Sequence, residues 1–210
     1  MGLKEKIKSS PTLKKLAFWM LSPKNQARPR LWIRAFVNPF KHKKEKGSLI
    51  RRRVRMDVMP FNNFVIGQDS TIEDFSTINN GVGDVIIGNR TRIGLGNTLI
   101  GPVTVGNDVM FAQNVVASGL NHGYEDITLP IADQPVVTIP IIIEDEVWVG
   151  ANAVITAGVT VGKHSIVAAG CVVVKNVPAY SIVGGNPGRI LKQYNSETKM
   201  WEKSIKKING

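Results

Sequence analysis

One histidine of this chain stands in a segment that interrupts an otherwise regular sequence. Residues 118–135 read SGLNHGYEDITLPIADQP, a polar stretch that contains two prolines and His122. A histidine side chain titrates near neutral pH and can take a proton from an attacking hydroxyl or amine. We therefore consider His122 a candidate general base, with a surface histidine of no chemical role as the alternative.

The other histidines and the single cysteine lie in surroundings less suited to chemistry. His42 belongs to the basic stretch FKHKKEK, and His164 occupies the fourth position of a six-residue unit, where we expect an exposed corner. Cys171 occupies the fifth position of its unit, so it should face inward and fill the core rather than carry an acyl group. A zinc site needs about three histidines directed at one ion. The three histidines lie in unrelated settings, and we predict no metal.

A six-residue periodicity defines the elements that must position His122. From Ile143 an aliphatic residue opens six successive units: IEDEVW, VGANAV, ITAGVT, VGKHSI, VAAGCV and VVKNVP. Related units occur upstream, where Ile87 and Val105 open units that are separated by the same interval as Ile143 and Val161, three units in each case. Six residues suit a short strand and a tight corner, and three such units close one triangular coil. Stacked coils pair their strands in parallel, so we predict an all-β solenoid.

The segment that contains His122 disturbs this spacing. The interval from Val105 to Ile143 is more than twice the length of one coil, so it holds one full coil and a surplus of similar length. A solenoid wall cannot accommodate so many polar residues, so we predict a loop over residues 117–136 that projects outward. Loops on rigid scaffolds frequently carry binding and catalysis. Ile127, Leu129 and Ile131 are expected to pin this loop onto a surface.

The repeat units and the closing segment GGNPGRILK resemble the hexapeptide-repeat acyltransferases, in particular their maltose, galactoside and polysaccharide O-acetyltransferase branch. The resemblance covers about residues 60–192. It implies a left-handed parallel β-helix, acetyl-CoA as acyl donor, a sugar acceptor, and a homotrimer with active sites between subunits. This branch carries a catalytic histidine in its protruding loop, often as Asn-His, and Asn121-His122 match that position. Glu125, Asp126 or a backbone carbonyl could orient the ring.

The same resemblance implies a set of binding residues. Trp148 matches a position that lines the acceptor or pantetheine channel, Asn97 could match an asparagine that contacts the acceptor, and Asn121 completes the predicted substrate-binding set. Val174 stands where the family more commonly has threonine. The predicted cofactor-binding residues are two small residues, a Val-Lys pair and two cations around the exit motif: Ala151, Ala169, Val174, Lys175, Arg189 and Lys192.

Charge is distributed unevenly along the 210 residues. Residues 1–56 hold 17 Lys and Arg against 2 Glu, whereas residues 57–189 hold 5 against 12 Asp and Glu. The net charge of +11 therefore reflects a basic leader, and we do not take it as a sign of nucleic-acid binding. We predict two short helices in this leader, joined near SPKNQARP. The first presents one apolar face, made of Leu13, Leu16, Ala17, Met20 and Leu21.

The predicted organisation has three parts. Residues 1–56 form a helical leader that caps the first coil, an interpretation we favour over docking on an anionic membrane, although both can hold. Residues 57–192 form the β-helix. Residues 193–210 form a C-terminal helix that begins at Ser196, with Met200, Trp201, Ile205 and Ile208 on one side. No apolar run is as long as a membrane span, and one cysteine fits a reducing compartment, so we expect a cytoplasmic location, with the inner face of the membrane as an option.

The main functional hypothesis is an O-acetyltransferase that acts on a sugar hydroxyl, for instance in cell-surface polysaccharide assembly. An amino-sugar N-acetyltransferase is the nearest alternative, because the sequence does not identify the acceptor. A β-helical metalloenzyme of the carbonic-anhydrase type is a second alternative, which would require a zinc site. The third is a non-catalytic module in which the basic leader binds nucleic acid or membrane and the solenoid is only a scaffold.

Overall fold

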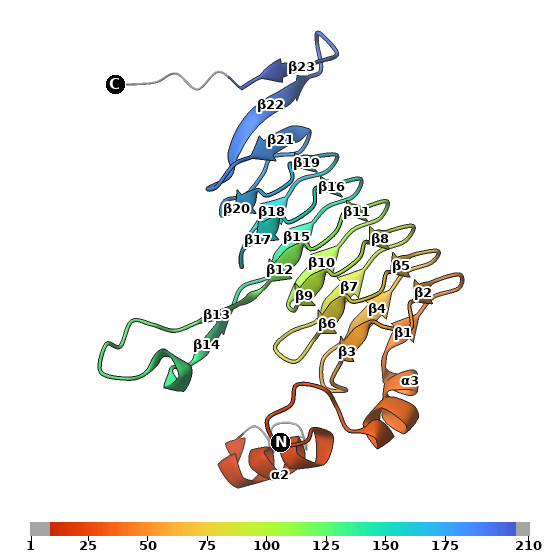
Figure 1. Cartoon of the computed structure of the whole chain (residues 1–210), viewed down its shortest axis with the longest axis vertical. Coiled ribbons are helices and arrows are strands. Elements are labelled where there is room, and N and C mark those ends of the chain that lie inside the picture. Colours follow the sequence, from red (N-terminus) through yellow and green to blue (C-terminus); the bar gives the residue numbers. More distant parts are fainter. Residues whose placement is uncertain (1–8, 205–210) are drawn as a thin grey trace.

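The structure of the chain is a computed structural model, and it describes residues 9–204. Three parallel sheets form the faces of a triangular prism, and two helical segments lie beyond its N-terminal end (Figure 1). The predicted fold class, a left-handed parallel β-helix solenoid, is confirmed. No helix within the described residues is both long enough and apolar enough to cross a membrane.

Each face of the prism stacks one short strand per coil. Sheet A consists of β1 (Lys43–Lys44), β4 (Phe64–Ile66), β7 (Val85–Ile87), β10 (Val103–Val105), β15 (Ile141–Ile143) and β18 (Thr160–Val161). Sheet B contains β2 (Leu49–Ile50), β5 (Thr71–Ile72), β8 (Arg92–Ile93), β11 (Met110–Phe111), β16 (Trp148–Val149), β19 (Ile166–Val167) and β21 (Ser181–Gly184). Sheet C consists of β3 (Arg55–Asp57), β6 (Thr77–Asn79), β9 (Thr98–Ile100), β12 (Val116–Ser118), β17 (Val154–Ile155) and β20 (Val172–Val173).

The strand register follows the spacing read from the sequence. Val105 pairs with Ile87 of the preceding coil and with Ile143 of the following coil. Ile143 in turn pairs with Val161. The surplus residues between Val105 and Ile143 therefore leave the strands on both sides in alignment.

The core is built from the first position of each six-residue unit. The openers form three columns inside the prism, and each of these side chains is at most 3% exposed: Ile66, Ile87, Val105, Ile143 and Val161 from sheet A, Ile72, Ile93, Phe111, Val149 and Val167 from sheet B, and Ile78, Leu99, Ala117, Ile155 and Val173 from sheet C. Full burial of such a side chain stabilises the folded state by roughly 1.5–3 kcal/mol. These columns are the main source of the prism's rigidity.

The three edges of the prism differ in their tolerance of extra residues. Every connection from sheet A to sheet B, and every connection from sheet B to sheet C up to β20, has four residues. The connections from sheet C back to sheet A vary widely: residues 58–63, 80–84, 101–102, 119–140 and 156–159. We call this third edge the variable edge. All changes in coil length, including the segment with His122, fall on it.

The N-terminal end corrects one predicted boundary. The two predicted helices are present, as α2 (Pro11–Leu21) and as a π-helical turn, η1 (Ile33–Val37), continued by α3 (Asn38–Lys41). The solenoid, however, begins at β1 and not at residue 57. The first coil has a neighbour on one side only, and its inward positions are less buried than those of later coils. Lys44, which pairs with Ile66, is exposed, and Ile50 and Met56 are partly buried.

The predicted C-terminal helix is wrong over the described residues. The chain instead forms an antiparallel ribbon of β21, β22 (Arg189–Asn195) and β23 (Met200–Lys203). The Asn195 side chain accepts the amides of Glu197 and Thr198, which makes a turn where Ser196 was expected to start a helix. Trp201 packs edge-on against Tyr194, with ring centroids 5.6 Å apart. The predicted apolar positions Ile205 and Ile208 lie outside the described residues.

Candidate active site

The segment with His122 forms a β-hairpin that leaves the variable edge and projects from the prism (Figure 1). Its strands are β13 (Leu120–His122) and β14 (Val136–Thr138), and η2 (Ile131–Asp133) lies near the tip. At the base, the amide of Ile139 donates to the carbonyl of Gly119 over 2.9 Å. The entry and exit of the hairpin are therefore adjacent, which explains how the wall accepts it without a shift in register.

His122 is exposed at the end of β13, opposite Val136. Its ring makes no hydrogen bond to any residue between 9 and 204. Successive side chains of a strand point to opposite faces, so those of Asn121 and His122 leave the ribbon on opposite sides. Asn121 is thus not beside the imidazole in a single chain.

Neither acidic residue of the hairpin contacts His122. The Glu125 carboxylate accepts the amide of Tyr124, and this backbone hydrogen bond lowers its pKa. The Asp126 carboxylate accepts hydrogen bonds from the hydroxyl and the amide of Thr128. These hydrogen bonds, the one from the hydroxyl first, lower the pKa of Asp126. Both carboxylates thus organise the hairpin itself, and the ring of His122 has no orienting partner among the described residues.

The apolar residues of the hairpin are not pinned to the body of the same chain. Ile127 is 96% exposed, Ile131 58% and Leu129 48%. The tip is ordered internally by Gln134, which is 8% exposed and whose amide nitrogen donates to the carbonyls of Asp126 and Leu129. The expectation that these aliphatic residues contact a surface is therefore not met within one chain.

A pocket of about 370 Å³ lies at the C-terminal end of the prism, where β22 crosses the last coil. Three of the predicted cofactor-binding residues line it: Val174, Lys175 and Arg189. The same pocket includes Val177, Val183, Pro187 and Gly188, so its walls are mainly apolar with two cations. Sequence reasoning did not single out Asn176, Ile190 and Ser204, which also line the pocket. Their nearness follows from the antiparallel return of β22, which no local pattern indicated.

The pocket and the hairpin share the variable edge. Above the hairpin base, the amide of Gly158 donates to the carbonyl of Ile139 over 3.2 Å. One coil further, the Asn176 side chain accepts the amide of Thr160 over 2.8 Å, which brings Lys175 and Asn176 above residues 156–159. Coils are about 4.8 Å apart. The hairpin base and the pocket are therefore separated by about two coils along one edge.

The other predicted cofactor-binding residues lie elsewhere. Ala151 and Ala169 occupy successive coils on the edge between sheets B and C, where the amide of Gly170 donates to the carbonyl of Ala151 over 2.8 Å. Lys192 is exposed on β22, paired with Ile182. Within one chain, the predicted set is thus divided between two edges of the prism.

Asn97, predicted to contact the acceptor, lies buried inside the wall of the prism. Its side chain is 1% exposed, donates to the carbonyls of Gly94 and Ala112, and accepts the amide of Val115. Asn97 occupies the inward fifth position of its unit, as do the buried hydroxyl residues Ser70, Ser76, Thr91 and Ser165, which also bond to carbonyls of the following coil. The position within the unit was the signal that Asn97 stabilises the wall instead of contacting a substrate.

Trp148 is 48% exposed on sheet B, as its outward position predicted, but it lies on a face away from the variable edge. Its neighbours in the sheet are Met110 and Ile166. A single chain therefore does not bring Trp148 and His122 together.

The remaining reactive side chains are accounted for by the architecture. His164 lies at a corner with positive φ, and its Nδ1 lies 2.9 Å from a carboxylate oxygen of Glu146. Cys171 is fully buried, as predicted, and burial raises the pKa of its thiol. Among residues 9–204, no three His, Cys, Asp or Glu side chains form a group that could hold a metal ion.

Comparisons with known proteins agree with the repeat and the fold. Residues 140–175 match the family described as the hexapeptide repeat of succinyl-transferase. The chain is 31% identical over 109 residues to the putative lipopolysaccharide biosynthesis O-acetyl transferase WbbJ of Escherichia coli K12, an alignment that covers 49% of this chain and 56% of WbbJ. The chain thus spans about half the length of that curated relative.

Two solved structures share the fold. One is a variant of AntD, an N-acyltransferase from Bacillus cereus, in complex with dTDP-4-amino-4,6-dideoxyglucose and coenzyme A, with a TM-score of 0.64 and 20% identity over 79% of this chain and 91% of that one. The other is a maltose O-acetyltransferase from Clostridium difficile 630, with a TM-score of 0.53 and 22% identity over 90% and 88%. Over residues 140–175 the chain matches a hexapeptide repeat. Its predicted resemblance to the hexapeptide-repeat acyltransferases is confirmed.

Proposed function

We propose that the chain is an acetyl-CoA-dependent O-acetyltransferase that acts on a sugar hydroxyl, with His122 as general base. The observation that carries the proposal is the shared edge: the hairpin with His122 and the pocket of Val174, Lys175 and Arg189 lie about two coils apart on the variable edge. A cofactor held at the pocket can extend along that edge toward the imidazole.

In the proposed reaction, an unprotonated ring nitrogen of His122 takes the proton of the acceptor hydroxyl while its oxygen attacks the thioester carbonyl. The tetrahedral intermediate collapses, the carbon–sulfur bond breaks, and the thiolate of CoA receives the proton back from the imidazolium. General-base catalysis of this kind contributes roughly a hundred- to ten-thousand-fold in rate. Alignment of the hydroxyl and the thioester by the rigid prism supplies a further share.

The pocket suits one end of CoA. Its cations, Lys175 and Arg189, can pair with phosphate oxygens, and Arg can do so through two parallel hydrogen bonds. A volume of about 370 Å³ is small for the whole cofactor, which leaves the pantetheine arm to lie outside it along the prism. We assign Ala151 and Ala169 to the arm, because small exposed corners allow close approach to backbone amides, and Lys192 to a further phosphate contact.

We further propose a homotrimer with active sites between subunits. The predicted residues are divided between two edges of one prism, and the hairpin tip exposes Ile127, Leu129 and Ile131. Exposed aliphatic residues on a projecting ribbon favour contact with another chain. In such a trimer His122 of one subunit completes a site to which a neighbour contributes Trp148 or the alanine corner, and Asn121 contacts the acceptor or the neighbour.

The acceptor class rests on the sequence relatives. WbbJ is described as a lipopolysaccharide biosynthesis O-acetyl transferase, which supports a sugar hydroxyl in cell-surface polysaccharide assembly. AntD is an N-acyltransferase observed with a nucleotide-linked amino sugar, which supports the alternative of an amino-sugar N-acetyltransferase. Because acetyl-CoA is the proposed donor, we expect the reaction to take place in the cytoplasm.

The proposal is tested by incubation of the purified chain with radiolabelled acetyl-CoA and a panel of sugars and nucleotide-sugars, in matched hydroxyl and amino forms. Transfer to a hydroxyl supports the proposal, and alkali-stable transfer confined to amino sugars supports the alternative. Absence of transfer to every acceptor, together with no acetyl-CoA binding by calorimetry, would overturn both.

The intersubunit site is tested separately by mixing subunits. Trimers assembled from His122→Ala and Ala169→Trp chains should recover part of the activity, since the proposed site takes His122 from one subunit and the alanine corner from its neighbour, so some interfaces then combine two intact halves. No recovery in mixed trimers, with each single variant assembling normally, would show that both residues act within one chain.

A further inference from the structure

The helical segments at the N-terminal end of the prism leave large apolar side chains in contact with solvent. In the segment before the first coil, Phe40 is 91% exposed, Leu31 74%, Phe36 73% and Trp32 44%. Isolated apolar residues on a surface are common, but a contiguous group of aromatic and aliphatic side chains indicates an interaction site. These four residues are called the aromatic stripe below.

The aromatic stripe faces away from the solenoid. On the opposite side of the same helical segment, Ile33 is 1% exposed, and the Asn38 amide donates to the carbonyl of Val58 over 2.8 Å. Trp32, Phe36 and Phe40 are spaced by four residues, which aligns them on one face of a helical turn. The segment is thus anchored by one side and presents its aromatic side outward.

The first helix adds to this end of the molecule. Helix α2 contacts the body through Phe18, whose ring lies edge-on to Phe61 at 5.8 Å. Leu13, Leu16 and Met20, which the sequence predicted to share one apolar face, are each more than 40% exposed. The cap is therefore only partly used in covering the first coil, and much of its apolar surface has no partner among the described residues.

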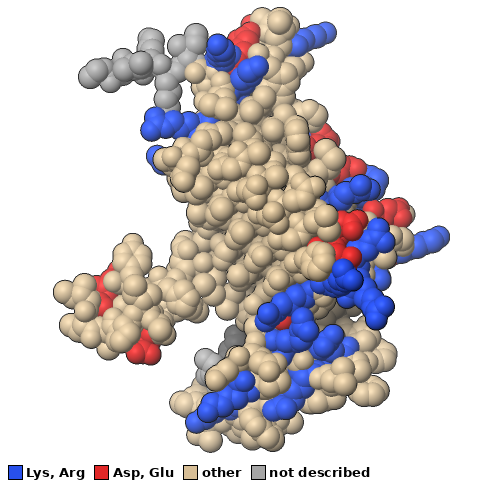
Figure 2. Space-filling view, viewed as in Figure 1, with Lys and Arg blue, Asp and Glu red and all other residues tan. Residues whose placement is uncertain are grey.

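Positive charge surrounds the exposed apolar surface. Residues 9–56 contain 14 Lys and Arg, and Glu45 is their one acidic residue. Lys and Arg gather over the helices and the first coils (Figure 2). Arg34, Lys41 and Lys44 form no ion pair with a described residue, whereas Lys43 pairs with Glu45 at 2.6 Å. Aromatic side chains flanked by unpaired cations are typical of segments that lie in the headgroup region of anionic bilayers.

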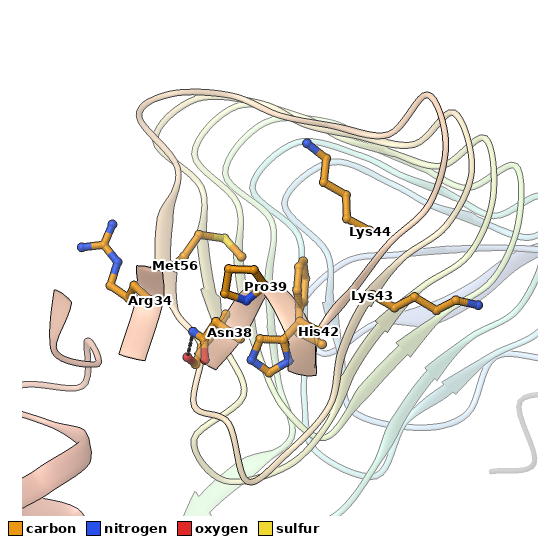
Figure 3. A pocket seen from close by; sticks show the side chains of 9 residues that line it. Arg34, Asn38, Pro39, His42, Lys43, Lys44 and Met56 are labelled. Atoms are coloured by element: carbon orange, nitrogen blue, oxygen red, sulfur yellow. Dashed lines mark hydrogen bonds between the residues drawn. The ribbon is translucent and has the colours of Figure 1, made fainter. Parts of the chain in front are cut away.

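The adjacent pocket does not account for these cations. A cavity of about 440 Å³ lies between the helices and the first coil, lined by Arg34, His42, Lys43 and Lys44 among others. The side chains of Arg34 and Lys43 point in opposite directions, away from the ring of His42 (Figure 3). Burial lowers the pKa of His42, and its two ring nitrogens have no hydrogen-bond partner among residues 9–204. Because these cationic side chains point in different directions, they are better placed to contact an extended anionic surface than to bind one small anion.

We propose that this end of the chain is a docking surface for anionic phospholipid bilayers. The aromatic stripe enters the headgroup region, and Arg34, Lys41 and Lys44 pair with lipid phosphates. The exposure of Leu31 favours a bilayer over RNA. Exposed aromatic rings beside cations suit either partner, because bases stack on them, whereas an aliphatic side chain gains more from insertion among lipids. The proposal is independent of the acetyltransferase assignment.

The test is flotation of the full chain with vesicles of phosphatidylcholine, with and without phosphatidylglycerol, at low and high salt. We expect binding to the anionic vesicles that weakens with salt. The double variant Phe36→Ser/Phe40→Ser should lower the partition coefficient at least about tenfold, because full burial of one such ring contributes roughly 1.5–3 kcal/mol. The triple variant Arg34→Gln/Lys41→Gln/Lys44→Gln should lose binding to anionic vesicles to a similar degree.

Matched controls come from the opposite end of the molecule. Met200→Ser removes an apolar residue that is 65% exposed, and Lys199→Gln/Lys203→Gln removes exposed cations, so both should bind vesicles as the unmodified chain does. Circular dichroism should show equal folding for all variants. Three results would overturn the proposal: no vesicle binding, binding abolished by nuclease treatment, or an oligomer of the unmodified chain that Phe36→Ser/Phe40→Ser dissociates while vesicle binding is absent.

Discussion

The wall of the prism and the hairpin that projects from it obey different physical constraints. In the wall, Ile143 is 1% exposed and is paired with coils before and after it, so its identity is fixed by packing. In the hairpin, Ile127 is 96% exposed and His122 has no side-chain partner among the described residues. Packing in the core constrains the residues of the wall, whereas the exposed residues of the hairpin are not constrained by core packing. Substitutions should therefore separate the two properties.

The largest expected effect is on catalysis. His122→Ala should lower the turnover of acetyl transfer by roughly a hundred- to ten-thousand-fold, because it removes the proposed general base. The affinity for CoA and the melting temperature should not change. Steady-state kinetics, calorimetry with CoA and thermal unfolding measure the three quantities. His164→Ala, at an exposed corner, is the matched control. Retention of most of the turnover in His122→Ala would remove this residue from the mechanism.

The wall should show the reverse behaviour. Ile143→Ala should lower the free energy of unfolding by about 2–5 kcal/mol, since it opens a cavity between three stacked coils. Its neighbour Ile142 is 41% exposed on the same strand, and Ile142→Ala should change stability by less than about 1 kcal/mol. Urea unfolding measures both. Equal costs at the two positions would contradict the assignment of inward and outward faces.

Asn97 distinguishes a structural from a functional polar residue. Asn97→Ala removes the hydrogen bonds to the amide of Val115 and to the carbonyl of Ala112, while the carbonyl of Gly94 keeps the hydroxyl of Ser76, so the change should cost about 1–3 kcal/mol of stability. The KM for the acceptor should be unaltered at a temperature where the variant is folded. A raised KM without loss of stability would restore the substrate role that the sequence suggested.

The smallest expected effect concerns Cys171. Cys171→Ala should destabilise the chain by about 1 kcal/mol, because the sulfur packs in the core below Gly188. Turnover should be unchanged, and the native thiol should react slowly with iodoacetamide, since burial raises its pKa. An inactive Cys171→Ala protein that still folds would instead indicate an acyl-enzyme step.

The periodic part of the chain was predictable from the sequence because each coil repeats the same pattern of inward aliphatic residues and short corners. The spacing of Val105 and Ile143 gave both the register and the position of the hairpin. The ends were harder to predict. In the first coil the inward position that pairs with Ile66 is occupied by Lys44, so only Ile50 and Met56 keep the apolar pattern. The apolar pattern around Met200 and Trp201 fits a helix as well as a strand, and the sequence predicted the helix. The contact of Trp201 with Tyr194, which belongs to the antiparallel ribbon, forms only in the folded chain.

The residues of the candidate site that belong to the closing sequence motif were predictable as a group. The spatial relation between residues on different faces of the prism was not. Val174, Lys175 and Arg189 gather in one pocket because the exit segment folds back over the last coil. Ala151, Ala169 and Trp148 lie on other faces of the prism, and only the proposed trimer would bring them near His122 of another chain. A sequence identifies residue types at such positions but contains no local signal for the neighbour that meets them.

The confinement of every length change to one edge means that the hairpin can vary without disturbing the wall. Because Ile139 bonds back to Gly119, the segment between them is a removable module: a transplanted hairpin of another length would leave the strands on either side in register. Gly119 itself has to be kept, since a Cβ there would lie 2.6 Å from the carbonyl oxygen of Pro102. The hairpin can therefore be exchanged as a single unit, with no change in the strands of the scaffold beneath it.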